Sequence, residues 1–116
     1  MFADRAVKTY AVRLSDATRH PERYGLPELS GLIEFGASPR ASIGLVQAAQ
    51  ALAMLRGRTH VTVADVRDLA ADVLRHRLVL SYDALADGVR ADDLVAGVLE
   101  AVRPMAAVSP AGDEAA

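Results

Sequence analysis

The chain has 116 residues, the length of one domain, and no cysteine, so it holds neither a disulfide framework nor a thiolate zinc site. Its formal charge of −2 gives no basic surface of the kind on which nucleic-acid-binding proteins depend. Because 52% of the residues are hydrophobic and only 4% are aromatic, the core must be aliphatic and rich in alanine, which favours an all-α fold.

The sequence carries no sign of export or of membrane insertion. Its start, MFADRAVK, lacks the apolar region of a signal peptide. No apolar run approaches the roughly 18 residues that a membrane-spanning helix requires. We therefore expect a cytoplasmic protein with no membrane span.

Residues 4–19 predict a first helix, because apolar residues recur along them at the i, i+3, i+4 and i+7 positions. These residues are Val7, Tyr10, Ala11 and Leu14. His20 and Pro21 end the helix, since the residue before a proline is pushed out of helical geometry. Residues 20–37 contain two prolines and three glycines and predict a loop. Within the loop, residues 32–35 form a short apolar segment that fits either a strand or a plug on the core.

A second helix is predicted from about residue 39 to residue 56. Ser38 is the expected N-cap and Pro39 the first helical residue, because proline suits that position. The apolar positions nearly encircle the helix, and they are Ile43, Leu45, Val46, Ala48, Ala49, Leu52, Ala53 and Leu55. A helix that is apolar all round is typical of a buried, central element.

A third helix is predicted over residues 62–77. Thr62 is its expected N-cap, and Asp65 follows three residues later, at the position where a capping box has glutamate or glutamine. After this helix, Ser81 begins a short helical segment that Gly88 ends.

The fourth main helix is predicted over about residues 91–102, and Pro104 stops it. The remaining residues, 105–116, are small and polar and predict a flexible tail. We therefore expect residues 1–104 to form one domain, a bundle of four main helices with one short extra helical segment.

The segment GASPRAS, residues 36–42, raises a question about Arg40. Arg40 falls in the first turn of the second predicted helix, where the helix dipole disfavours a cation by roughly 0.3–1 kcal/mol. A helix N-terminus is also a ready anion site, and a guanidinium there, with the hydroxyls of Ser38 and Ser42, would form a phosphate clamp. The alternative is that Arg40 pairs with Glu34 or lies in solvent.

The sequence offers no other constellation for catalysis or metal binding. Its histidines, His20, His60 and His76, form no HxxH or HExxH pair, so no metal site is expected. A hydrolase is also not expected, since there is no GxSxG elbow and no histidine at a spacing from Ser38 that indicates a catalytic pair. No GxxxxGK[ST] phosphate loop is present, so the chain cannot hold a nucleoside triphosphate by itself.

Three stretches of the sequence resemble the C-terminal helical lid of the MoxR family of AAA+ ATPases. They are YAVRLSDATRHP (10–21), GASPRASIGLVQAAQALAMLRGRTHVTVADVRDLAADVLRHRLVL (36–80) and GVRADDLVAGVLEAVRP (88–104). The middle stretch is the most specific, because GASPRA, a Gly-Arg turn, a Val-Thr helix start and a Leu-x-His-Arg-Leu exit follow in that order. Val63 departs from the family pattern, which usually has proline after the threonine.

The resemblance implies a role for Arg40, because the arginine of GASPRA is the sensor-two residue of such lids and contacts the γ-phosphate of ATP. It implies that the chain closes over ATP and Mg²⁺ bound by the P-loop core of a larger ATPase. Without Walker A and Walker B motifs, the chain alone should be inactive. The whole protein would be a chaperone-like ATPase in a homo-oligomeric ring, often a hexamer, with von Willebrand factor A-type proteins as partners.

Two hypotheses without nucleotide chemistry compete with the lid. A free-standing interaction module similar to a histone fold would also place a Thr-capped helix after a long central one, but it should dimerise and show a basic face. A small nucleic-acid-binding helical domain is the weaker alternative, since the chain has a charge of −2. A P-loop encoded upstream of Met1 would decide for the lid.

Overall fold

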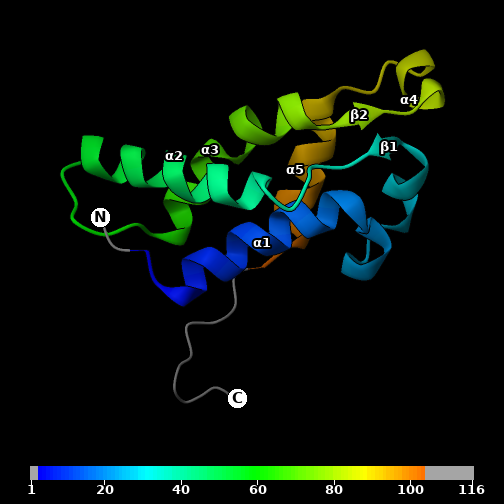
Figure 1. Ribbon diagram of the computed structural model, residues 1–116. Helices are drawn as coiled ribbons and strands as arrows, with labels where there is room; N and C mark the ends of the chain where they lie inside the picture. The colour runs from blue at the N-terminus through cyan, green and yellow to red at the C-terminus, as the bar shows by residue number, and fades with distance from the viewer. Residues whose placement is uncertain (1–2, 104–116) are drawn as a thin grey trace.

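The computed structural model describes residues 3–103, which form a helical bundle with a two-stranded sheet at one end (Figure 1). Its α-helices are α1 (Arg5–Arg19), α2 (Ala41–Leu55), α3 (Val63–Leu74), α4 (Tyr82–Ala86) and α5 (Ala91–Ala101). The other elements are the 3₁₀ turns Pro21–Tyr24, Pro27–Gly31 and Arg75–Arg77 and the strands β1 (Ile33–Phe35) and β2 (Val79–Leu80). The predicted all-α class, with four main helices and one short helix, is confirmed.

Local capping signals explain where most of the helices begin. The carboxylate of Asp4 accepts a hydrogen bond from the backbone N–H of Val7, and α1 follows. Thr62 and Asp65 form the predicted capping box in front of α3. The hydroxyl of Ser81 accepts from the backbone N–H of Ala84 at the start of α4. Each bond satisfies a helix N–H that has no partner within the helix.

The helix ends also lie near their predicted positions. The last turn of the third predicted helix tightens into the 3₁₀ turn Arg75–Arg77. α5 ends at Ala101, one residue before the predicted end. The stop at Pro104 and the flexible tail at 105–116 lie outside the described residues. None of the described helices is long and apolar enough to cross a membrane.

The apolar segment at residues 32–35 contains the strand β1. It pairs antiparallel with β2, with Ile33 opposite Leu80 and Phe35 opposite Val79. Ile33 is buried against the core while Phe35 is exposed, so the strand alternative holds and Ile33 also serves as the plug. The sheet and α4 lie together at one end of the bundle (Figure 1).

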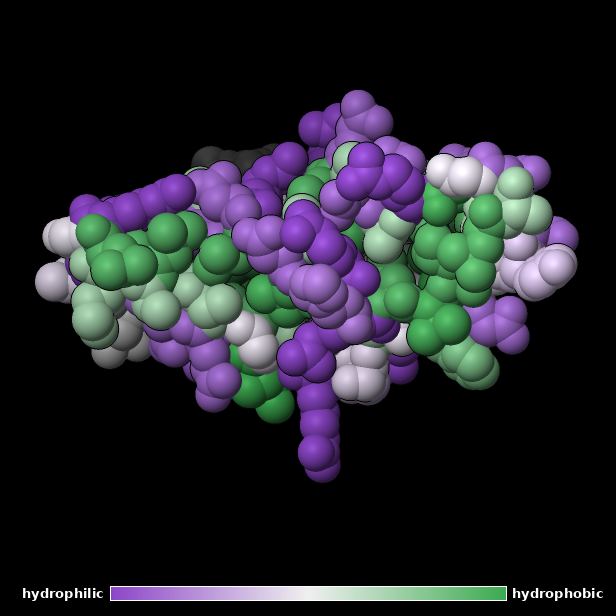
Figure 2. Space-filling model, turned by 90° about the horizontal axis from the view of Figure 1, so that it is seen from above, coloured by the Kyte–Doolittle hydropathy of each residue, from purple (hydrophilic) through white to green (hydrophobic). Residues whose placement is uncertain are grey.

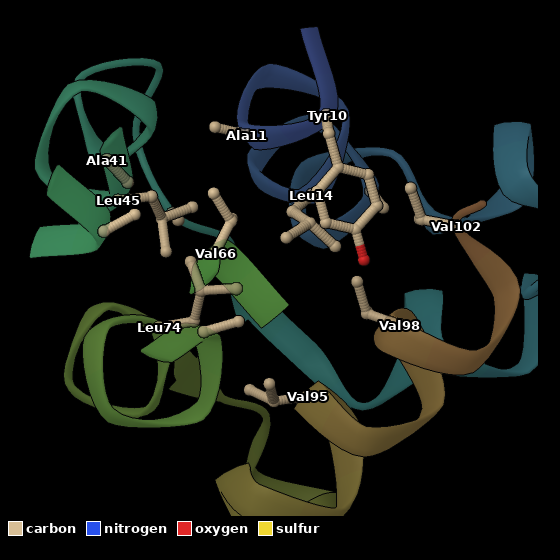
Figure 3. Packing of buried hydrophobic residues seen from close by; sticks show 14 of the residues in the cluster. Tyr10, Ala11, Leu14, Ala41, Leu45, Val66, Leu74, Val95, Val98 and Val102 are labelled. Carbon is tan, nitrogen blue, oxygen red and sulfur yellow. The ribbon is translucent and has the colours of Figure 1, made fainter. Parts of the chain in front are cut away.

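The core lies between α1, α2, α3 and α5, and Figure 3 shows their apolar side chains converging. The labelled residues are Tyr10, Ala11 and Leu14 from α1, Ala41 and Leu45 from α2, Val66 and Leu74 from α3, and Val95, Val98 and Val102 from α5 and its C-cap. Many of the remaining buried positions are alanines, which lets the helices approach closely. The predicted aliphatic, alanine-rich core is confirmed.

The prediction that the second helix is buried all round is wrong. Leu45, Ala49 and Ala53 are fully buried, but Ile43 is 57% exposed and Leu55 is 85% exposed. Leu52, an expected core residue, is only partly buried. Figure 2 shows apolar residues gathered at both ends of one face, over the C-terminal part of α2 and around β2 and α4, with a polar band between them.

Candidate functional site

The GASPRAS segment lies where the chain leaves the sheet and enters α2. Arg40 directly precedes the helix, and its backbone is already helical, with φ −70° and ψ −16°. The expected cap by the Ser38 side chain is wrong, because the main chain closes this turn instead. The N–H of Ala41 donates to the carbonyl of Ser38 at 2.9 Å, and the N–H of Ile43 donates to the carbonyl of Arg40 at 3.1 Å. As a result, α2 begins two residues later than predicted.

The side chain of Arg40 is exposed and makes no hydrogen bond or ion pair within residues 3–103. Of the alternatives to the phosphate clamp, the pair with Glu34 is therefore not formed, whereas an Arg40 that lies in solvent matches the described chain. The Ser38 hydroxyl is also exposed and has no partner in the same part of the chain. The Ser42 hydroxyl differs, because it donates to the carbonyl of Pro39 at 2.9 Å. Of the three predicted phosphate-binding side chains, two are thus open to a ligand.

The backbone before Arg40 rests on the C-terminal turn of α1. The N–H of Ala37 donates to the Thr18 hydroxyl at 2.8 Å, across 19 residues of sequence. Gly36 touches the same turn, since a Cβ added to it would lie 2.4 Å from the Thr18 carbonyl oxygen. Ala37 and Ala41, on either side of Arg40, are fully buried. A fixed backbone therefore carries the exposed Arg40 side chain.

An apolar groove of about 310 Å³ lies between α1 and α2, and its lining begins at Ser42, two residues after Arg40. Its lining residues are Lys8, Val12, Ser42, Ile43, Val46 and Gln47. Ile43 and Gln47 lie three and seven positions after Arg40, which places all three on one side of the helix. Val12 and Ile43 are both more than half exposed. A cation and an exposed apolar surface of this kind are typical of a binding face.

A different arrangement of arginines lies at the other end of α2. Asp65, at the third position of α3, is fully buried and accepts hydrogen bonds from two arginines. Arg58 donates through two bonds, one of them 2.8 Å long, and Arg56 donates at 3.1 Å. The backbone N–H of Thr62 adds a bond of 2.9 Å. These bonds, led by those from Arg58, hold the pKa of Asp65 well below its ordinary value of 3.8.

The histidines do not come together as a site. His20 lies 3.8 Å from the carboxylate of Glu22 at the exposed end of α1. Within residues 3–103, no group of three or more histidine, cysteine, aspartate or glutamate side chains is arranged to hold a metal ion. The face that contains Arg40 and the groove is therefore the candidate site of the described chain.

Comparison with known proteins identifies the fold. The AAA lid domain family matches residues 30–98, which are more than half of the chain. The chain belongs to this family. It is a lid of the MoxR type, because it is 48% identical over 101 residues to Chaperone MoxR1 of Mycobacterium tuberculosis and 41% identical over 83 residues to Protein MoxR of Paracoccus denitrificans. These matches cover 87% and 68% of this chain and 27% and 24% of the relatives.

A solved structure has the same fold as the lid. The crystal structure of a protein from Cytophaga hutchinsonii, assigned as an ATPase, superposes with a TM-score of 0.86 at 34% identity. The match covers 89% of the lid and 31% of that chain. The lid thus spans about a third or less of the length of the proteins it matches.

Two parts of the lid escaped the sequence analysis. The pairing of Arg56 and Arg58 with Asp65 depends on the turn at Gly57, whose φ of 77° lets the chain reverse between the helices. The Arg-Gly-Arg spacing before a capping box was the available signal. The hydrogen bond between Thr18 and Ala37 joins two segments that are distant in sequence, so no local sequence pattern predicts it.

Proposed function

We propose that this lid closes over ATP held by a P-loop AAA+ core and that Arg40 contacts the γ-phosphate as the sensor-two residue. The supporting observation is that Arg40 is exposed, without a partner in residues 3–103, at a helix N-terminus. A cation there is unfavourable by roughly 0.3–1 kcal/mol in the free lid. Beside a terminal phosphate, the same guanidinium gains charge-assisted hydrogen bonds that outweigh this cost.

The groove next to Arg40 supports docking onto the core. Val12 and Ile43 line it and are exposed in the lid alone, so covering them would remove apolar surface from water. The open hydroxyl of Ser38 would add a donor to the nucleotide. The Ser42 hydroxyl would have to turn away from the Pro39 carbonyl before it could do the same. The core, rather than the lid, would hold Mg²⁺.

The proposal extends to the whole protein. Residues 1–104 form the lid domain and residues 105–116 its tail, in a cytoplasmic, chaperone-like ATPase. The chaperone role follows the name of the relative from Mycobacterium tuberculosis. Assembly into a homo-oligomeric ring, often a hexamer, and partnership with von Willebrand factor A-type proteins belong to the same proposal. The lid alone, without Walker motifs, should not hydrolyse ATP and should bind it no more tightly than about millimolar.

Replacement of Arg40 in the intact ATPase that carries this lid tests the proposal. Arg40→Ala should lower kcat by about ten- to a hundredfold, the worth of one charge-assisted hydrogen bond, and should change the affinity for ATP less. Arg5→Ala is the matched control, since Arg5 is also an exposed arginine at a helix N-terminus without a partner in residues 3–103. Equal turnover of the Arg40 variant and the control would refute the proposal.

A further inference from the structure

We propose that Thr18 is a positioning residue for Arg40, acting through the backbone of Gly36 and Ala37. This inference rests on the proposed role of Arg40 at the γ-phosphate. Thr18 itself would touch no nucleotide, because its side chain is buried, with 1% of its surface exposed. Its effect would be to fix the backbone position of Arg40, from which the exposed side chain extends.

The Thr18 hydroxyl is fixed in orientation by two hydrogen bonds. It donates to the carbonyl of Ser15 at 2.7 Å and accepts from the backbone N–H of Ala37 at 2.8 Å. The donor of a hydroxyl is thus used within α1, and its acceptor function is left for the incoming chain. The Ala37 N–H lies between β1 and α2, where neither element offers it a backbone partner. Thr18 therefore supplies the bond that this buried N–H requires.

Gly36 makes the contact close enough for this bond to form. A Cβ at this position would lie 2.4 Å from the carbonyl oxygen of Thr18 and 2.5 Å from its carbonyl carbon. Both are backbone atoms of a helix and cannot move aside. The absence of a side chain therefore lets the start of the GASPRAS segment lie directly on α1.

The consequence reaches Arg40 because the backbone on both sides of it is held. Ala37 is fixed by Thr18 and is fully buried, and Ala41 is fully buried against the core. Only two residues, Ser38 and Pro39, separate Ala37 from Arg40. The arginine side chain is free, but its Cα has little room to shift. A displacement of about 1 Å of a group that contacts a transition state can lower the rate by 10²-fold.

Four variants of the intact ATPase test the inference: Thr18→Val, Thr18→Ser, Arg40→Ala and the double variant Thr18→Val/Arg40→Ala. Thr18→Val removes the hydroxyl and keeps the shape, and we expect kcat to fall severalfold with a smaller change in KM for ATP. Thr18→Ser keeps the hydroxyl and should restore most of the turnover. In the Arg40→Ala background, Thr18→Val should cause no further fall, because there is no arginine left to place. Thr9→Val serves as control, since the Thr9 hydroxyl has no partner in residues 3–103.

A second measurement keeps the test informative if Thr18→Val is poorly folded. In the lid itself, amide hydrogen exchange of Ala37 should rise in Thr18→Val and remain near wild type in Thr18→Ser, with α3 equally protected in both. An equal fall in kcat with and without Arg40 would show a general structural role and overturn the inference. Normal turnover of Thr18→Val, while Arg40→Ala is impaired, would overturn the inference alone. Normal turnover of Arg40→Ala would overturn the proposed function, and the inference with it.

Discussion

At the C-terminal end of α2, Arg56 and Arg58 both donate to the buried carboxylate of Asp65, whereas at its N-terminal end Arg40 is exposed and has no partner in residues 3–103. The dipole of the helix favours cations at the first end and disfavours them at the second. The first two arginines thus stabilise this chain. The third, Arg40, pairs with no group in residues 3–103.

The exposed apolar residues do not follow this division, because Met54 and Leu55 at the C-terminal end of α2 are 66% and 85% exposed. Around Asp65, each charged group finds its partner within the chain, and the turn is complete. Around Arg40, Val12 and Ile43 remain exposed beside a groove. A helix that is apolar on its outer face and cationic at its start has the composition of an interface. What separates the two ends is therefore the pairing of their arginines: Arg56 and Arg58 are bound to Asp65, whereas Arg40 has no partner in residues 3–103.

The largest expected effect is at the C-terminal end of α2, where Arg56 and Arg58 pair with Asp65. Asp65→Asn should lower the free energy of unfolding of the lid by about 3 kcal/mol, because it leaves two arginines without their buried carboxylate and weakens the cap of α3. Asp68→Asn is the matched control, since Asp68 is exposed and pairs with Arg56 at 2.9 Å. It should cost less than about 1 kcal/mol. Urea unfolding compares the two, and equal losses would show that burial of Asp65 adds nothing.

The same carboxylate should make the lid sensitive to acid. The pKa of Asp65 is held well below 3.8 in the folded lid, so the unfolded chain takes up this proton first as the pH falls. The stabilisation is fully present above the ordinary pKa and is lost progressively below about pH 5. Wild-type Tm should therefore fall more steeply between pH 5 and pH 2.5 than the Tm of Asp65→Asn. Parallel curves would assign the acid sensitivity to other groups.

The sequence predicted the helices well because their starts depend on local chemistry. Asp4, Thr62 with Asp65, and Ser81 each lie within three residues of the N–H that they cap. The burial of α2 on all sides was mispredicted. The apolar pattern shows which residues could be buried, but it does not show whether other elements of the chain cover them.

The candidate site was predicted only in part, for a related reason. The conflict between Arg40 and the helix dipole is local, so it marked the residue without any structure. The support beneath it is not local. The bond from Ala37 to Thr18 and the close approach of Gly36 to α1 depend on how two segments 18 or more residues apart meet in space. A threonine or a glycine in the sequence does not by itself predict such a contact.

The smallest expected effect is at the N-terminal end of α2. It decides whether Arg40 stabilises the lid or is available to a group outside it. Arg40→Ala should leave the stability of the lid unchanged or raise it by a few tenths of a kcal/mol, because it removes a cation from the positive end of the helix dipole. Arg5→Ala in the first turn of α1 measures how much of any gain comes simply from placing alanine at a helix start. Thermal unfolding of both variants beside wild type gives the comparison. A loss above about 1.5 kcal/mol for Arg40→Ala, with Arg5→Ala unaffected, would make Arg40 a structural residue like Arg58. A neutral result leaves the exposed guanidinium without a use inside the lid, which is the condition that a phosphate ligand from another domain requires.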